Sequence, residues 1–300
     1  RDINVMTVQT AVRALGAKYK KYDDEDKEID KTDIDSKKEE IKNLIVSAKG
    51  IILDECQHTS CESCQVISDA SQKAYYRYGC SGTPYRDQGD DILIDACFGK
   101  CIADINSSYL IQHGYLVKPE ICMIRVDNMK HIKYSSYAKI YEQAIKENTL
   151  RNSWIAKIAN KLADEGRPPL ILVNHIDHGN ILKSLIPNSE FLHGSISNKI
   201  RKEHLDKMRN KQCGPTIASV IFDEGINVQS LDTLILAGAG KSATRALQRI
   251  GRILRPYPGK TSALAIDFYD DCKYLKDHSK KRLKIYQSEK EFVIKHLDAV

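Results

Sequence analysis

The sequence lacks long apolar runs, internal repeats and low-complexity tracts. Its longest apolar runs, Leu170–Val173 and Leu234–Ala237, fall far short of the ~20 residues that a membrane span needs. Residues 1–20 carry charges throughout and hold no apolar core of the kind found in a signal peptide. We therefore expect no membrane partner, and a protein that is cytoplasmic or nucleoid-associated rather than secreted.

Disordered, collagen-like and disulfide-scaffold classes are excluded by composition. Hydrophobic residues make up 42% of the 300 residues and charged residues 29%, which is ordinary for globular domains. The nine cysteines are an odd number in a long chain, so we interpret them as reduced thiols. The length predicts two domains.

Charge is spread unevenly along the chain. Residues 1–120 hold 16 basic and 21 acidic side chains, whereas residues 121–300 hold 30 and 19. A basic second half attracts polyanions, of which nucleic acid is the usual one, but the same charge also serves solubility. Charge alone leaves both interpretations open.

From Leu170 onward, short strands alternate with helices of about ten residues. This alternation predicts an α/β fold with a parallel sheet and helices on both faces. The expected strands are 170–174, 190–193, 216–222, 233–236 and 262–268, and the expected helices are 177–186, 197–210 and 244–254. Residues 271–300 are expected to form a basic helix that docks through Leu283, Tyr286, Phe292 and Leu297.

The first part of the chain follows the same pattern but holds fewer strands. We expect residues 5–15 to run from strand into helix, 36–48 to be a helix, and 50–53 and 76–80 to be strands, the former buried. This is too few strands for a complete sheet. Two helical stretches follow Pro119, and the tyrosines on the first of them fit a buried face better than a base-stacking one.

Two adjacent carboxylates follow the apolar run 50–53. In open α/β sheets, ligands bind at the carboxyl ends of strands. Asp54 is suited to hold hydrated Mg²⁺, and Glu55 to orient and deprotonate a water aimed at a γ-phosphate. Taken alone, the pair also fits a strand that ends in a polar turn.

Two further segments carry similar chemistry. Ser81-Gly-Thr-Pro84 follows a strand, and its hydroxyls are able to bond a neighbouring strand-end carboxylate. Gln248-Arg-Ile-Gly-Arg-Ile-Leu-Arg255 places arginines three residues apart on a helix, as phosphoryl transfer uses them. Each segment alone also has a plain structural interpretation, as a turn and as a basic helix face.

Together, in this order and spacing, the three segments closely resemble motifs II, III and VI of superfamily 2 helicases. Further matches lie at Thr7–Thr10, at 170–175 (motif IV), at His193-Gly194 and at 217–228 (motif V). Gly114–Pro119 resembles the exit from the first domain in the DExH branch, which includes phage-type branched-DNA helicases and Rad25-type translocases. The resemblance spans about residues 5–270.

The resemblance implies an ATP-dependent helicase or translocase of two RecA-like domains with parallel sheets. The first domain would be residues 1–118, incomplete at its N-terminus, and the second residues 119–300. The cofactors would be ATP and Mg²⁺, and the partner a nucleic acid, with DNA favoured over RNA. Asp54 and Glu55 would be both metal-binding and catalytic, together with Arg252 and Arg255.

Other roles implied by the resemblance concern nucleotide and strand contacts. The nucleotide-binding residues would be Gln57, His58, Glu224, Gly225 and Gln248. The nucleic-acid contacts would be Thr7, Gln9, Thr10, His175, Gly194 and Ser219. Such backbone contacts carry little sequence information.

The phosphate loop of the family does not occur in these 300 residues. Gly240-Lys241-Ser242 imitates its end, but Ile235 stands where the loop needs its first glycine, so we interpret the segment as a connector. Because the phosphates then lack a holder, we expect the chain as printed not to hydrolyse ATP efficiently. The start at Arg1 favours a fragment of a longer helicase.

Two alternatives stay open. One is a non-catalytic nucleic-acid-binding module derived from a helicase, and the other is the motor part of a restriction-type translocase. Intact Asp54, Glu55, Arg252 and Arg255 argue against the non-catalytic module, because these side chains have no evident structural task.

Overall fold

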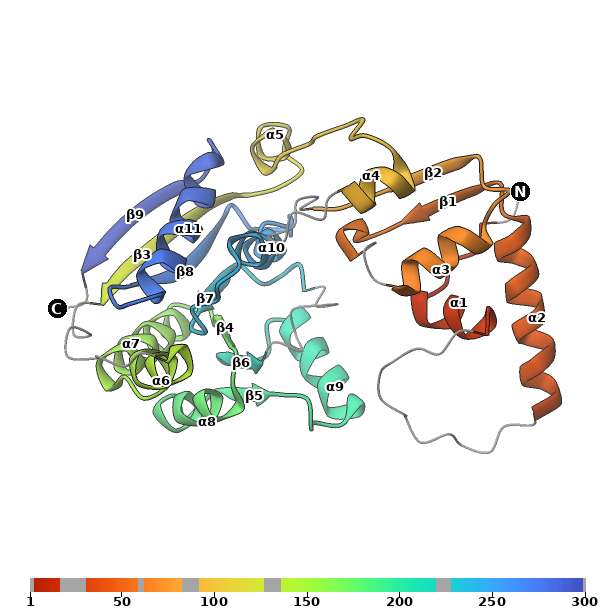
Figure 1. Ribbon diagram of the computed structural model, residues 1–300. Helices are drawn as coiled ribbons and strands as arrows, with labels where there is room; N and C mark the ends of the chain where they lie inside the picture. The colour runs from red at the N-terminus through yellow and green to blue at the C-terminus, as the bar shows by residue number, and fades with distance from the viewer. Residues whose placement is uncertain are drawn as a thin grey trace. The chain divides into compact units, whose positions relative to one another are not determined.

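The computed structural model describes residues 3–16, 31–58, 62–82, 92–126, 136–219 and 228–298. The chain divides into two compact units, residues 1–104 and 105–300 (Figure 1). The predicted boundary at 118/119 falls inside unit 2. Helix α5 (Ser107–Gln112) belongs to unit 2, because the Ser108 hydroxyl donates to Glu289 at 2.9 Å. The two-domain assignment with that boundary stays a prediction.

Unit 1 holds a small parallel sheet of two strands in its described part. Strand β1 (Gly50–Leu53) pairs with β2 (Tyr76–Gly79), as Gly50 with Tyr76 and Leu53 with Gly79. The helices are α1 (Val8–Ala14), α2 (Lys31–Ser47), α3 (Glu62–Ala70) and α4 (Ile92–Phe98). A 3₁₀ turn over Cys56–His58 follows β1.

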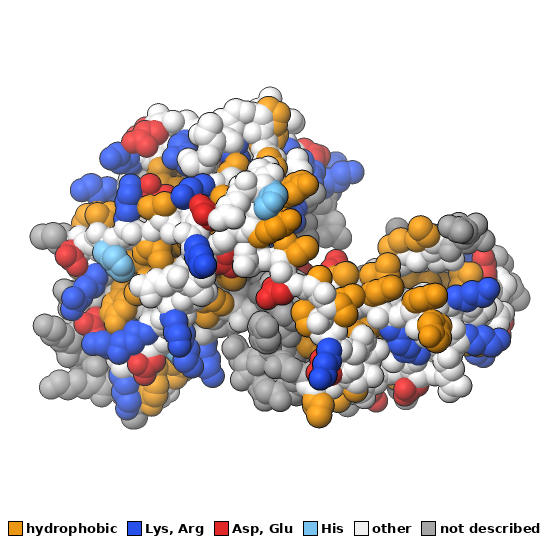
Figure 2. Space-filling view, turned by 90° about the horizontal axis from the view of Figure 1, so that it is seen from above, with side chains coloured by type: hydrophobic (Ala, Val, Ile, Leu, Met, Phe, Trp, Pro, Cys, Tyr) orange, Lys and Arg blue, Asp and Glu red, His pale blue; other side chains and the backbone are white. Residues whose placement is uncertain are grey.

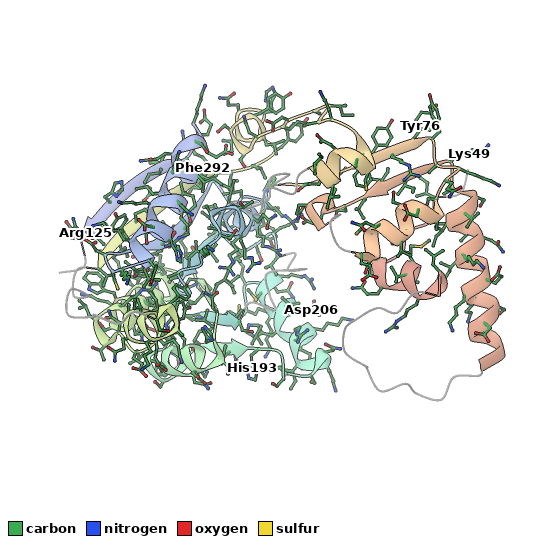
Figure 3. The ribbon with its side chains drawn as sticks, in the orientation of Figure 1. Lys49, Tyr76, Arg125, His193, Asp206 and Phe292 are labelled. Carbon is green, nitrogen blue, oxygen red and sulfur yellow. The ribbon has the colours of Figure 1, made fainter. Side chains whose placement is uncertain are left out.

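Two expectations for unit 1 are wrong. Residues 3–7 form no strand, and the segment leads straight into α1, where Thr7 is the N-cap. Strand β1 is not buried, because Ile52 is 73% exposed and Tyr76 on β2 is 58% exposed. In Figure 3, Tyr76 lies on the side of the two strands away from α1 and α3. Figure 2 shows hydrophobic side chains on this face of the unit.

In its described residues, unit 2 is built on a seven-stranded, all-parallel sheet with the order β5-β6-β4-β7-β8-β3-β9. The strands are β3 (Lys118–Val126), β4 (Leu170–Val173), β5 (Glu190–Leu192), β6 (Thr216–Ser219), β7 (Thr233–Leu236), β8 (Ser262–Asp270) and β9 (Val293–Asp298). The predicted α/β class with a parallel sheet is confirmed.

Helices cover both faces of this sheet, and residues alternate along each strand between the two cores. One core includes Ile171 and Val173 with α6 (Tyr137–Tyr141), the π-helical turn Glu142–Lys146, α7 (Thr149–Asp164) and α8 (Ile176–Leu185). The other includes Leu170 and Leu172 with α9 (Asn198–Arg209), α10 (Ala243–Ile253) and α11 (Leu275–Ser288). Buried Ile140, Tyr141 and Ile145 agree with the core interpretation of that helix, but Tyr137 is 42% exposed, so the interpretation is wrong for that tyrosine. Tyr134 lies outside the described residues.

Two strands of unit 2 were not expected. Strand β3 follows Gly114–Val117, where only helical stretches were anticipated, and β9 lies in the tail that was expected to be helical throughout. Both pair in parallel, as Ile121 with Ile294, at the edge of the sheet. Tyr286 and Phe292 are buried as expected, whereas Leu297 is 55% exposed and does not dock.

In the described part of the chain, no helix combines the length and the apolar character that a membrane crossing requires.

Candidate active site

Asp54 and Glu55 lie at the carboxyl end of β1 and are both exposed. The Glu55 amide donates to Asp54 Oδ1 at 3.0 Å. Glu55 has a φ of 54°, a left-handed conformation that is uncommon for residues other than glycine. Strained backbone of this kind persists where the surrounding structure fixes it, and it gathers at functional sites.

The segment around Ser81 meets the carboxylates through Gln57. Gln57 Nε2 donates to Glu55 Oε2 at 2.5 Å, and Ser81 Oγ donates to Gln57 Oε1 at 2.5 Å. The sequence predicted that the hydroxyls of this segment are able to bond a neighbouring strand-end carboxylate, and of the two, Thr83 lies outside the described residues. Ser81 is connected to Glu55 through the Gln57 amide, which accepts from the serine with its oxygen and donates to the glutamate with its nitrogen.

The close approach of the two strand ends depends on a glycine. The Cys56 amide donates to the Cys80 carbonyl at 2.9 Å, and the Cys80 amide to the Leu53 carbonyl at 2.8 Å. A Cβ at Gly79 would lie 2.9 Å from Cys56 Cβ, closer than side chains pack. Glycine at position 79 therefore lets the strand ends approach.

The donor set of Asp54 and Glu55 fits a magnesium ion. Mg²⁺ prefers hard oxygen ligands and is usually bound through one or two carboxylates, with waters and substrate phosphates completing its shell. Among the described residues, no group of three or more His, Cys, Asp or Glu side chains could hold a metal by itself. The site thus suits a metal that arrives with a phosphate ligand.

The arginine segment of unit 2 lies on and just beyond α10. Gln248 and Arg252 are half-buried on the helix, but the helix ends at Ile253, so half-buried Arg255 lies outside it. The expected single helical face for Arg252 and Arg255 is therefore wrong. The Arg255 carbonyl is held by Lys260 Nζ at 2.9 Å, which also donates to the carbonyls of Gln229 and Leu231.

Side chains far away in the sequence hold the loop that leads into α10. Arg151 Nη1 donates to the Ala237 carbonyl at 2.7 Å, and Tyr141 Oη to the Gly238 carbonyl at 2.8 Å. Asn174 Nδ2 also donates to the Gly238 carbonyl. Arg282 Nη1 donates to the Gly240 carbonyl at 2.8 Å. Four donors thus fix this short segment.

Two buried ion pairs support those arginines. Arg151 Nε pairs with Asp270 Oδ1 at 2.9 Å, and both side chains are fully buried. Arg282 Nε pairs with Asp267 Oδ2 at 2.7 Å, and Tyr286 Oη donates to the same carboxylate oxygen at 2.8 Å. Both acids come from β8.

The charges of these pairs oppose the effect of burial. Burial raises the pKa of Asp270, and the positive charge of Arg151 counters that rise. Burial alone would lower the pKa of Arg282, but Asp267 outweighs it and raises the pKa. Sequence inspection missed all four residues. The available signal was a charged residue in an apolar strand, as Asp267 is in Ser262–Asp270.

The residues predicted to contact nucleic acid differ in their exposure. Thr7, Gln9 and Thr10 are exposed at the start of α1, where Thr7 Oγ1 accepts from the Thr10 amide. His175 is exposed at the N-cap of α8, and its ring lies 5.1 Å from that of Tyr141, centre to centre.

Exposed Gly194 follows β5, whereas Ser219, at the end of β6, is only 6% exposed. All six predicted contacts with nucleic acid stay predictions. Glu224, Gly225 and the side chain of His58 lie outside the described residues.

Comparison with known proteins decides the nature of unit 2. Residues 152–257, which run from α7 to just beyond Arg255, match the helicase conserved C-terminal domain. The match covers about a third of the chain, and we call residues 152–257 the helicase C-terminal domain after it. The predicted resemblance to superfamily 2 helicases is thereby confirmed, and the helicase C-terminal domain contains the predicted Gln248, Arg252 and Arg255.

Two curated relatives extend the match beyond the helicase C-terminal domain. The ATP-dependent DNA helicase uvsW of Enterobacteria phage T4 is 27% identical over 261 residues, which cover 79% of this chain and 52% of the relative. A protein of Haloarcula marismortui named for the DNA helicase Rad25 is 27% identical over 212 residues, covering 69% of this chain and 33% of the relative. The chain thus spans about half the phage relative and a third of the other.

Solved structures share the fold. The crystal structure of T4 UvsW has a TM-score of 0.51 at 24% identity, over 86% of this chain and 56% of that one. Yeast Dbp5 bound to RNA and ADP BeF3 has a TM-score of 0.56 at 13% identity, over 84% and 60%. The structural neighbours are RecA-like helicase domains, as expected.

Proposed function

We propose that this chain is the motor part of an ATP-dependent helicase or translocase that moves along nucleic acid. The observation that carries the proposal is the hydrogen-bonded line Ser81–Gln57–Glu55 at the carboxyl ends of two parallel strands. A helicase C-terminal domain in the same chain supplies the arginines that phosphoryl transfer requires.

On this proposal, Glu55 is the general base. Its carboxylate is exposed, and Gln57 holds one oxygen, so the other oxygen is available to orient and deprotonate the attacking water. Asp54 would hold Mg²⁺, which supplies charge neutralisation at the phosphates when bound. Ser81 fixes the position of Gln57 through a hydrogen bond. Gln57 and His58 would couple the nucleotide site to the second domain.

Residues of the helicase C-terminal domain act on the same γ-phosphate. Arg252 and Arg255 would neutralise the charge that develops there, and Gln248, Glu224 and Gly225 would contact the nucleotide. The loop before α10 has little freedom to move, because four side-chain donors hold its carbonyls. A fixed loop favours electrostatic stabilisation, since the charges need no rearrangement during the reaction.

Nucleic acid would contact the exposed hydroxyl and amide groups of Thr7, Gln9 and Thr10 in unit 1. In unit 2 the contacts would be His175, Gly194 and Ser219. We favour DNA, since the phage relative is named a DNA helicase, and RNA is the alternative, since the Dbp5 structure contains RNA. Opening and closing of the two units with each ATP would move the chain along the strand.

The test is nucleic-acid-stimulated ATP hydrolysis by the protein expressed from its whole reading frame. Glu55→Gln is expected to lower kcat by about 10²–10⁴-fold, the usual contribution of a general base. Glu62→Gln is the matched control, because Glu62 is exposed on α3 of the same unit. If the Glu55→Gln variant hydrolyses ATP as fast as wild type, the assignment of Glu55 as general base is refuted. Nucleic-acid binding with no hydrolysis in wild type would favour the binding-module alternative.

A further inference from the structure

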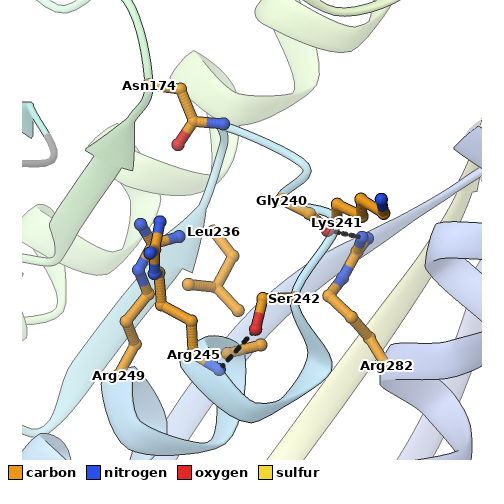
Figure 4. Close-up of a pocket in the computed structure, with 9 residues that line it drawn as sticks. Asn174, Leu236, Gly240, Lys241, Ser242, Arg245, Arg249 and Arg282 are labelled. Carbon is orange, nitrogen blue, oxygen red and sulfur yellow. Dashed lines mark hydrogen bonds between the residues drawn. The ribbon is translucent and has the colours of Figure 1, made fainter. Parts of the chain in front are cut away.

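A pocket of about 320 Å³ lies beside the start of α10, and cations dominate its wall (Figure 4). Lys241, Arg245, Arg249 and Arg282 all line it, and no described lining residue is a carboxylate. We call this the Arg245 pocket. Its volume is at the lower end of the range for small-ligand sites, roughly 300–1,000 Å³.

One side of the Arg245 pocket is rigid. It includes Gly240, whose carbonyl accepts from Arg282, and Asn174, whose amide holds the Gly238 carbonyl. Ala239, between Gly238 and Gly240, has a φ of 44°. A Cβ at Gly238 would lie 2.8 Å from Asn174 Cγ. Because the loop is packed this closely, the pocket exists before any ligand arrives, and binding costs little reorganisation.

The opposite side carries concentrated positive charge. Arg245 and Arg249 are four residues apart on α10, so their guanidinium groups lie on the same helix face, as Figure 4 shows. Like charges at this spacing repel each other. The N-terminal end of α10 adds the positive end of the helix dipole, which favours an anion at this end of the helix.

The pocket is open to a ligand at two of its cations. Lys241 and Arg245 are exposed, whereas Arg249 is 6% and Arg282 1% exposed. The charge of Arg282 is already matched by Asp267 behind the pocket. Exposed Arg245 therefore makes the first contact and Arg249 forms the inner wall, whereas the amine of Lys241 points away from Arg245 in Figure 4.

We propose that the Arg245 pocket binds a phosphate group, at a site separate from the predicted γ-phosphate residues Arg252 and Arg255. The planar guanidinium fork matches phosphate oxygens in pairs, which favours phosphate over smaller anions. The phosphate belongs either to a nucleic-acid strand, a source that rests on the proposed function, or to a small phosphate compound. The two sources share one chemistry and differ in their tests.

The test compares two double variants of the 300-residue chain. Lys241→Gln with Arg245→Gln removes the exposed cations of the pocket. Lys157→Gln with Lys161→Gln removes the same charge from exposed positions on α7. Equal melting temperatures of the two variants show that both are folded. Isothermal titration calorimetry with inorganic pyrophosphate and fluorescence anisotropy with a labelled thymidine oligonucleotide then measure binding.

We expect the pocket variant to bind pyrophosphate at least tenfold more weakly than the α7 variant and wild type. If a strand supplies the phosphate, the slope of log Kd against log salt also falls by about 0.7 per lost contact. An unchanged slope with lost pyrophosphate binding assigns the pocket to a small phosphate compound.

Equal pyrophosphate affinities of the pocket and α7 variants would overturn the proposal. This outcome is distinct from failure of the proposed function. Wild type that binds no oligonucleotide, but binds pyrophosphate through Lys241 and Arg245, would retain the pocket and refute the nucleic-acid motor.

Discussion

The two units hold their motif residues in opposite ways. In unit 1, exposed Glu55 is held by Gln57, two residues along the chain. In unit 2, the loop before α10 is held by Arg151 and Arg282, which are buried and pair with acids on β8. The unit 1 motif thus contains its own support, whereas the unit 2 motif depends on buried charges from outside it. Changes far from the motif should therefore affect unit 2 more than unit 1.

The largest expected effect is the loss of a buried ion-pair partner in unit 2. Arg151→Met leaves Asp270 buried without its cation, which typically costs about 3–5 kcal/mol of unfolding free energy. Urea unfolding followed by the fluorescence of Trp154, the single tryptophan, reports on this unit because Trp154 lies on α7.

Two controls separate the pair from general effects of mutation. Arg151→Met combined with Asp270→Leu should recover most of the loss, because no unpaired charge then remains. Lys161→Met, which removes an exposed partner of Glu165, should cost at most about 0.5 kcal/mol. A single Arg151→Met variant as stable as Lys161→Met would remove the contrast between the units.

A smaller effect is expected where the two strands of unit 1 meet most closely. Gly79→Ala places a Cβ 2.9 Å from Cys56 Cβ, and overpacking of this kind costs about 1–3 kcal/mol. Gly50→Ala is the matched control, since its nearest neighbour would be at 3.6 Å. Hydrogen exchange at the β1 amides measures the opening free energy. Equal exchange in the two variants would show that the strand ends are loosely packed.

The smallest effect is a pH dependence confined to unit 2. Burial, followed by the charge of Arg151, lowers the pKa of His178 from 6.5 to about 3. Below pH 6.5 this histidine is protonated in the unfolded chain but stays neutral in the folded chain. The free energy of unfolding therefore falls as pH drops from about 6.5 towards 3. Because of His178, the free energy of unfolding should fall by about 1 kcal/mol between about pH 7.5 and pH 5.5.

The difference between two histidine variants isolates that contribution. His178→Asn should lose about 1 kcal/mol of the pH dependence of Trp154-monitored unfolding, whereas His175→Asn, at an exposed position on the same helix, should retain it. Parallel pH profiles of the two variants would contradict the assignment.

Much of the fold of unit 2 could be predicted from local pattern. The strands at 170–173, 190–192 and 233–236 and the helix capped by Ser197 lie where alternation and capping place them. Strands β3 and β9 were missed because their places in the sheet depend on distant partners. Strand β3 pairs with β8 and β9, and β9 pairs with β3 at the edge, with 166 residues between Val126 and Val293. Strand β1 was predicted as buried, but only one of its faces is covered in the described residues.

The candidate site was predictable where chemistry depends on residue type and order. Asp54, Glu55, Gln57 and Ser81 occur within short segments, and the structure brings them together within unit 1. The support of the unit 2 loop was not predictable, because Arg151 and Asp270 are 119 residues apart and nothing local to either indicates the partner. Burial and pairing of charges arise only from tertiary packing.

On the proposed function, Glu55 of unit 1 and Arg252 of the helicase C-terminal domain serve one hydrolysis reaction. The most direct measurement is a double-mutant cycle on nucleic-acid-stimulated ATP hydrolysis, with Glu55→Gln, Arg252→Gln and both. Each single change should lower kcat by about 10²-fold or more, and the double variant should lose little beyond the larger single effect, because residues that act as a unit are not additive. Hydrolysis that is unchanged by Arg252→Gln, or effects that simply multiply, would contradict the account.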